Sequence, residues 1–162
     1  MSDTGTAAWA ALLRVHAALV PVLDRELQAT CNLPLTWYDV LLELNSAPGR
    51  RLSMGQLGEV AVVSRTRVSR VVDQLAGEGL VVREANPDDR RSAYATITDA
   101  GRKRLRAAAP VYRAGIQRHF TSQMSAAESR SVATALEKVL CALADYPRSS
   151  RHLIHRRSSD RL

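Results

Sequence analysis

The chain is poor in lysine, cysteine and aromatic residues. Among its 23 lysine and arginine residues only Lys103 and Lys138 are lysines, so arginine carries nearly all the positive charge. The two cysteines, Cys31 and Cys141, are too few for a disulfide framework, and neither lies in a C-x-x-C motif. No cluster of basic residues surrounds either cysteine in the sequence, so we interpret both thiols as buried or inert.

Membrane and secretion signals are also lacking. No run approaches the roughly 18 apolar residues that a membrane span needs. The N-terminus, MSDTGTAAWAALL, lacks the basic region that precedes the apolar segment of a signal peptide. We therefore expect a cytoplasmic protein that does not bind membranes.

Signatures of catalysis are missing as well. The sequence has no nucleophile motif, no phosphate-binding loop and no metal triad, so we expect neither an enzyme nor a cofactor. His152 and His155 have a spacing compatible with a metal ion, but two ligands are too few. We therefore predict no metal site.

The chain carries a strong positive charge, and it has enough hydrophobic residues to fold. Its 162 residues are 46% hydrophobic, enough for one domain over 1–147. The net charge is +7, which favours a polyanionic partner such as nucleic acid. Five arginines and one aspartate lie in 148–162, a basic tail that we expect to be disordered. The excess of arginine suits phosphate binding, but it equally fits a bias in genomic base composition.

Hydrophobic spacing and helix-capping residues predict about six helices and two strands, a mainly α (α+β) fold. The first helix covers about 6–28 and is interrupted by Pro21. The second begins at Thr36, whose side chain can cap it, with Asp39 at the third helical position as in a capping box. Ser53 with Gln56 opens a short helix over 53–61. The remaining elements are a helix over 64–77, strands over about 80–85 and 93–98, a long helix capped by Thr98, and a last helix opened by Ser125 and Glu128.

The helices at 53–61 and 64–77 are joined by only a few residues, an arrangement typical of a helix-turn-helix. On the second helix the apolar positions form one stripe, made of Val68, Val71, Val72 and Leu75. Facing away from this stripe we predict a DNA-recognition surface of Arg65, Thr66, Arg67, Ser69 and Arg70. Ser64 and the helix N-terminus are candidates to hold a phosphate. Taken alone, the same helix is better interpreted as a surface helix with a solvated charged face, and it is the hairpin that follows it that favours DNA recognition.

The segment NPDDRRSAY at 86–94 lies between the two predicted strands and makes them a hairpin, so the unit becomes a winged helix-turn-helix. A wing can insert an arginine into the minor groove of DNA. An acid beside the guanidinium fixes its direction, and this explains why acids and arginines lie side by side at a tip with little net charge. The alternative is an ordinary polar turn.

The stretch SMGQLGEVAVVSRTRVSRVVDQLAGEGLVVREANPDDRRSAYATITDAG resembles the core of the MarR (multiple antibiotic resistance regulator) family, and the resemblance extends over about 6–145. It implies a DNA-binding lobe at about 36–98 and dimerisation helices at about 6–30 and 99–145. By motif, Arg91 matches the arginine that enters the minor groove, Asp89 its orienting acid, and Arg90 a second cation. Arg70 matches a recognition-helix arginine near DNA, and Arg83 matches a basic residue near the backbone.

The resemblance implies a homodimer on a near-palindromic, double-stranded operator, acting as a repressor that a small phenolic or anionic ligand releases. Candidate ligand residues are Trp9, His16, Trp37, Tyr38 and Arg113, although an aromatic residue on a helix stripe is more often core. Two alternatives remain: a regulator that senses oxidants through Cys31, and a helical interaction protein on a winged scaffold.

Overall fold

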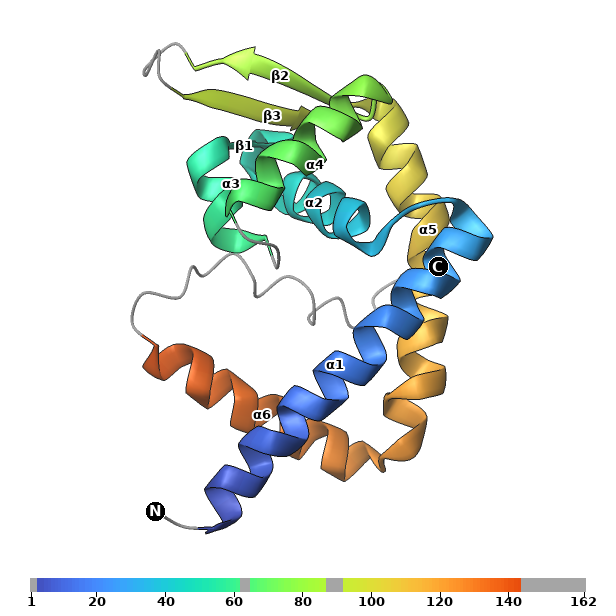
Figure 1. Ribbon diagram of the computed structural model, residues 1–162, viewed down its shortest axis with the longest axis vertical. Helices are drawn as coiled ribbons and strands as arrows, with labels where there is room; N and C mark the ends of the chain where they lie inside the picture. The colour runs from blue at the N-terminus through green and yellow to red at the C-terminus, as the bar shows by residue number, and fades with distance from the viewer. Residues whose placement is uncertain (1–2, 62–64, 87–91, 144–162) are drawn as a thin grey trace, which may run out of the picture. The chain divides into compact units, whose positions relative to one another are not determined.

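The computed structural model describes residues 3–61, 65–86 and 92–143, without the side chains of residues 65 and 66. Its helices and strands follow one another along the chain (Figure 1) as α1 Asp3–Cys31, α2 Leu35–Ser46, η1 Pro48–Arg50, β1 Arg51–Ser53, α3 Met54–Val60, α4 Arg65–Gly77, β2 Val81–Ala85, β3 Ala93–Ile97, α5 Asp99–His119, η2 Thr121–Gln123 and α6 Ala126–Ala142. This confirms the mainly helical fold with six α-helices and a wing.

The described residues form two compact units. The first holds 3–35 and 107–136, and the second holds 36–106 together with 137–143. The first contains α1 and the second half of α5, and the second contains α2 to α4 and the sheet.

Helix α1 is longer than predicted and continues through Pro21. By length and composition alone it is apolar enough to cross a membrane, which differs from the expectation that no segment of the chain is. Only Leu23 and Leu27 of this helix are buried, whereas Trp9, Leu12, Leu13 and Val15 are exposed. Such an apolar face is also what a soluble helix presents to a partner helix.

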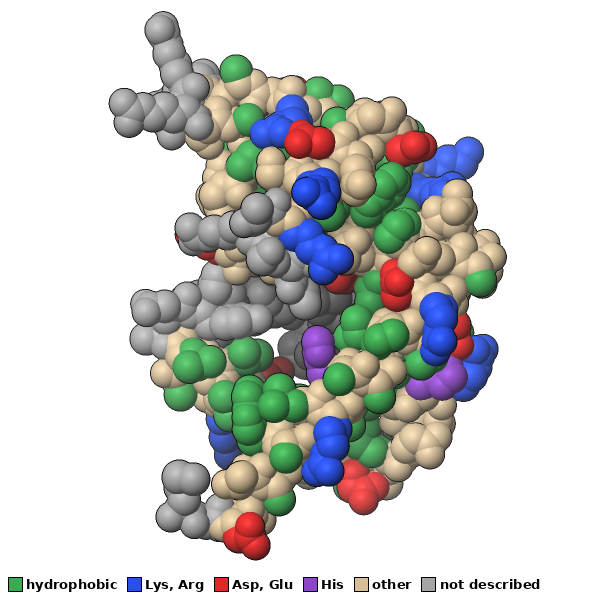
Figure 2. Space-filling model, viewed as in Figure 1, with side chains coloured by type: hydrophobic (Ala, Val, Ile, Leu, Met, Phe, Trp, Pro, Cys, Tyr) green, Lys and Arg blue, Asp and Glu red, His purple; other side chains and the backbone are tan. Residues whose placement is uncertain are grey.

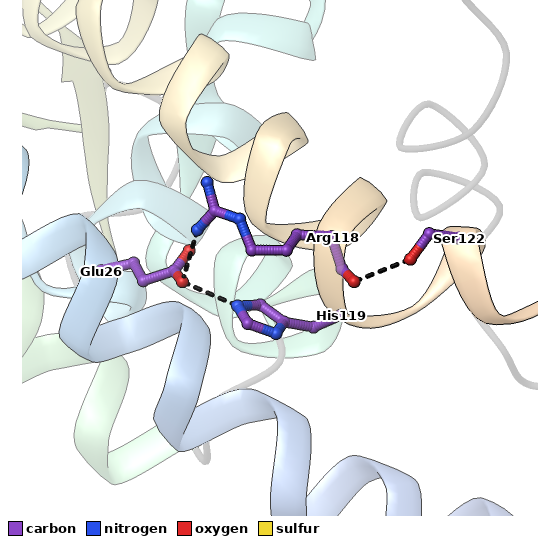
Figure 3. A network of polar contacts seen from close by, with 4 residues as sticks. All are labelled: Glu26, Arg118, His119 and Ser122. Carbon is purple, nitrogen blue, oxygen red and sulfur yellow. Dashed lines mark hydrogen bonds and ion pairs between the residues drawn. The ribbon is translucent and has the colours of Figure 1, made fainter.

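A polar cluster and a close approach join α1 to α5 within the first unit. The Glu26 carboxylate accepts hydrogen bonds from Arg118 at 2.9 Å and from His119 Nε2 at 2.7 Å (Figure 3). The bond from His119, with a smaller contribution from Arg118, holds the pKa of Glu26 below its usual range. A Cβ at Gly115 would lie 2.7 Å from the end of the Leu23 side chain and 2.8 Å from Glu26 Oε2, so α1 and α5 pack closely here and a larger residue would make these two side chains shift.

Helix α2 begins one residue earlier than predicted, and its first turn is capped differently. The backbone N–H of Leu35 donates to Asp24 Oδ1 at 2.8 Å, so an acid on α1 takes the role predicted for Thr36. Asp39 does not complete a capping box. Burial raises its pKa to about 7, and burial together with the nearby charge of Asp39 raises the pKa of Glu43 to about 7 as well.

The second unit contains a three-stranded sheet in the order β1-β3-β2, with both pairings antiparallel. The hairpin of β2 and β3 is the predicted wing, and its register runs from Val81 opposite Ile97 to Ala85 opposite Ala93. The three-residue β1 was not predicted, because three residues are too few to show the alternation of apolar and polar side chains that indicates a strand.

Glycine and threonine fix the two ends of the wing. Gly79, with a φ of 69°, closes α4 through Gly79 N–H to Ala76 O and Leu80 N–H to Leu75 O, which turns the chain into β2. Thr98 accepts from Gly101 N–H at 3.0 Å, which confirms it as the cap of α5, and its hydroxyl donates to Gly79 O at 2.8 Å. A Cβ at Gly101 would collide with Leu80 O, so this glycine lets α5 start directly against the wing.

Helix α6 has no buried residue in this single chain, although its capping box of Ser125 and Glu128 forms as predicted. The exposed large hydrophobic side chains on it and directly after it are Val132, Val139, Leu140 and Leu143. Cys141 is exposed and Cys31 is half-buried, so neither thiol is fully buried, and the expectation that they are inert stays a prediction. Hydrophobic side chains are visible on the surface along α1 and α6 in Figure 2.

The raised pKa values of Asp39 and Glu43 give a pH-dependent prediction. A carboxyl whose pKa is higher in the folded state favours folding below its unfolded pKa, and this contribution is lost as the pH rises toward about 7. Glu43→Gln should therefore raise the unfolding free energy by about 1 kcal/mol at pH 8, with a smaller gain at pH 5. Melting curves at the two pH values test this, with exposed Glu137→Gln as the control; an equal gain at both would contradict it.

Candidate nucleic-acid interface

The helix-turn-helix begins with a capping box at α3. Ser53 Oγ accepts from Gln56 N–H at 3.2 Å, and Gln56 Oε1 accepts from Ser53 N–H at 2.9 Å, as the sequence predicted. Leu57 and Val60 of α3 are buried, which anchors this short helix on the lobe. The turn to α4 includes Ser64, which lies outside the described residues.

One face of α4 is buried in the lobe, as predicted from its apolar spacing. Val68, Val71, Val72 and Leu75 are between 0% and 4% exposed. Their burial orients the helix and leaves Arg67 and Arg70 exposed on the opposite side, with Ser69 half-buried beside them. Neither the side chains of Arg65 and Thr66 nor their contacts are described, so their recognition roles stay predictions.

Two side-chain contacts hold the second half of α4, one on each flank. Asp73 forms an ion pair with Arg83 of β2, which ties the helix to the wing. Gln74 Oε1 accepts a hydrogen bond from Trp37 Nε1 of α2 at 3.3 Å. Helical spacing puts Asp73 and Gln74 on opposite flanks of α4, but the sequence carries no signal for their partners, because these partners lie on other elements.

The wing strands are described, but the predicted wing-tip residues Asp89, Arg90 and Arg91 lie outside the described residues. On the face of the sheet opposite Arg83, the guanidinium of Arg51 stacks 4.7 Å from the ring centroid of Tyr94, and Thr96 Oγ1 donates to Glu84 at 3.0 Å. These contacts join all three strands, so the base of the wing is a braced sheet.

The ligand candidates fall into different environments. Trp9, His16 and Arg113 are exposed in the first unit, and Trp9 and His16 are two turns apart on α1. Trp37 and Tyr38 belong to the second unit, where Trp37 is half-buried and Tyr38 is a core residue with 4% exposure. Among the described residues, no three histidine, cysteine, aspartate or glutamate side chains group to hold a metal ion.

Comparison with known proteins assigns this architecture to a family. A profile of the MarR family matches residues 32–92. The chain is 32% identical over 128 residues to the HTH-type transcriptional repressor Rv2887 of Mycobacterium tuberculosis, covering 79% of this chain and 89% of that protein. The chain belongs to the MarR family. It is therefore a transcriptional regulator of a family whose members bind DNA and are generally not enzymes.

Two further relatives agree with this assignment. The chain is 35% identical over 83 residues to the HTH-type regulator YkoM of Bacillus subtilis, covering 51% of this chain and only about half, 53%, of YkoM. Sco3205, a MarR family regulator of Streptomyces coelicolor solved in complex with DNA, superposes with a TM-score of 0.77 at 29% identity. That match covers 88% of this chain and 93% of Sco3205.

The ion pair between α4 and the wing gives a prediction that separates DNA binding from stability. Both side chains are substantially exposed, 37% for Arg83 and 57% for Asp73, so the pair adds little to folding. Asp73→Asn should change the melting temperature by less than about 2 °C. It should weaken DNA binding several-fold, because the contact that fixes the position of the wing relative to α4 is lost.

Exposed Glu78→Gln, just beyond the end of α4, is the matched charge control for fluorescence anisotropy with duplex DNA. Asp73→Asn binding DNA as tightly as that control would show that the ion pair does not position the wing.

Proposed function

We propose that this protein is a homodimeric repressor that binds a near-palindromic operator in double-stranded DNA and leaves it when a small ligand binds. The observation that carries the proposal is the orientation of α4, whose valine face is buried while Arg67 and Arg70 face solvent. The repressor activity of Rv2887 and the DNA complex of Sco3205 support it by similarity. A repressor acts on DNA, and we place it in the cytoplasm.

In this proposal the exposed face of α4 reads the major groove. Arginine donates two parallel hydrogen bonds to the O6 and N7 atoms of guanine, or to phosphate oxygens. Arg65, Thr66, Arg67, Ser69 and Arg70 form the surface that faces the bases, and Ser64 with the first turn of α4 holds a phosphate. Arg83 lies close to the DNA backbone while Asp73 holds it against α4.

The wing supplies the second contact. Arg91 enters the minor groove, where the negative potential is strongest at narrow A·T-rich stretches, and Asp89 directs its guanidinium. Arg90 adds a phosphate contact beside it. The braced sheet of β1, β3 and β2 supports this role, because a loop on a rigid base loses less conformational freedom on binding.

Dimerisation uses α1, α5 and α6. The exposed hydrophobic residues on α1 and α6 support this, because a monomer in water leaves them uncovered. A two-fold dimer presents two copies of α4 to half-sites about one helical turn apart. The candidates to contact a phenolic or anionic effector are Trp9, His16, Trp37, Tyr38 and Arg113.

Oxidation at Cys31 is the second candidate for control, because the cysteine at the end of α1 is half-buried rather than enclosed. Comparing operator binding by the reduced and oxidised protein separates the two. A loss of affinity on oxidation that Cys31→Ser abolishes supports the thiol, whereas loss of affinity with phenolic acids at constant redox state supports the ligand.

A gel shift with the DNA upstream of its own gene tests the proposal itself. Retardation at low salt that survives competition by unrelated DNA is the expected result. Absence of any retardation at low salt, where phosphate contacts are strongest, would refute it and favour the helical interaction protein.

Arg91→Ala should weaken operator binding by about 10-fold, because the wing loses its minor-groove contact. Sedimentation should give an unchanged dimer, since residue 91 lies outside the proposed dimer helices. Lys103→Ala, which removes one exposed positive charge from α5, is the control. Equal affinities of the two variants would exclude the wing from recognition.

Removal of residues 148–162 should lower non-specific DNA affinity, because the tail holds five arginines and one aspartate. If these arginines bind phosphates, the slope of log affinity against log salt becomes shallower by about 0.9 for each phosphate that the shortened chain leaves unneutralised. An identical slope for the full and shortened chains would mean that the tail does not bind DNA.

A further inference from the structure

Gln74 lies on the exposed side of α4, one turn after Arg70, and has a partner on another helix. Its Oε1 accepts the hydrogen bond from Trp37 Nε1 at 3.3 Å. Trp37 is half-buried on α2, next to Tyr38, which is 4% exposed in the lobe core. The indole therefore belongs to a fixed part of the lobe, whereas the glutamine it holds belongs to the recognition helix (α2 and α4 in Figure 1).

The chemistry of this bond determines which way the glutamine amide faces. An indole nitrogen only donates, so it pairs with the amide oxygen and not with the amide nitrogen. With Oε1 turned toward Trp37, the Nε2 group and its two N–H donors point away from the indole. Because Gln74 is exposed, these donors are available to a ligand that approaches α4 from solvent.

We propose that Trp37 is a positioning residue for DNA recognition, which holds Gln74 with its amide N–H groups directed at a phosphate oxygen of the operator. This inference rests on the proposed DNA-binding function. A phosphate is the partner rather than a base edge, because the N-terminal turn of a recognition helix is the part that contacts bases. Gln74 lies in the second half of α4, beyond that turn, and glutamine side chains are among those that bind phosphate oxygens of DNA.

The opposite flank of the helix shows why this contact is separate from the wing. On one flank Asp73 forms an ion pair with Arg83 of β2. On the other flank Gln74 forms a neutral hydrogen bond with Trp37 of α2. A preset amide loses less side-chain freedom when DNA binds than a free one. Trp37 thereby contributes to affinity without touching DNA.

Three substitutions separate positioning from packing. Trp37→Phe keeps an aromatic ring but removes the donor that sets the amide. Gln74→Leu removes both the bond and the outward donors. Gln74→Glu keeps an acceptor for the indole but replaces the outward N–H groups with a negative oxygen, and Gln117→Glu on α5 is its charge-matched control.

Anisotropy titrations with the upstream duplex, at several salt concentrations, measure the effect. Gln74→Leu should weaken binding by about five-fold, the worth of one neutral hydrogen bond. Trp37→Phe should weaken it by about three-fold, because the amide keeps its donors but must be ordered when DNA binds. Gln74→Glu should weaken it further than Gln117→Glu does. The salt slope should not change for Trp37→Phe, because no charge is removed, and Trp37→Phe should add nothing in the Gln74→Leu background.

The bond itself is visible in the NMR spectrum, because the chain has two tryptophans and Trp37→Phe assigns their indole N–H signals. The Trp37 signal should move in Gln74→Leu and stay close to its wild-type position in Gln74→Glu. Affinities of Trp37→Phe and Gln74→Leu within two-fold of wild type would overturn the proposal while leaving the DNA-binding function intact. Failure of the wild-type protein to bind any duplex at low salt would instead refute the function, and this inference with it.

Discussion

The burial of one apolar face of α4 is the constraint on which the rest of the DNA-binding account depends. Val68, Val71, Val72 and Leu75 are nearly inaccessible to solvent, and each contributes to stability in proportion to the apolar surface removed from water. A helix so anchored cannot rotate about its axis without exposing them. The positions of Arg67 and Arg70 on the solvent side follow from this burial rather than from any contact that the arginines make.

Neighbouring elements convert that fixed orientation into a rigid surface. The glycine that closes α4 directs the chain into β2, and the third strand, β1, braces the hairpin from its other edge. The Asp73–Arg83 pair and the Trp37–Gln74 bond then secure the two flanks of the helix. In the other unit, the Glu26 cluster joins α1 to α5, and Gly115 lets the two helices pack closely.

Much of the fold was predictable because it follows from local rules. The spacing of the α4 valines, the capping boxes at Ser53 and Ser125, and the cap at Thr98 are read within a few residues, and all were confirmed. The failures involve distant partners: Leu35 is capped by Asp24 on another helix, and Asp39 is turned inward by the packing of its lobe. The exposure of Cys141 could not be read from the sequence, because an apolar stripe shows which residues share a face, not whether this chain alone covers that face.

In the candidate site too, the residues that follow from local spacing were predicted and the contacts between distant residues were not. Arg67 and Arg70 were placed correctly from periodicity. Trp37 was considered as a ligand or core residue, because its bond to Gln74 joins residues far apart in sequence. The most direct test of the central claim is the affinity of Arg67→Ala and Arg70→Ala for the upstream duplex, measured against unrelated DNA. The account predicts that both lose the preference for the upstream duplex while melting at the wild-type temperature. Unchanged preference in both variants would contradict the claim that this face of α4 reads DNA.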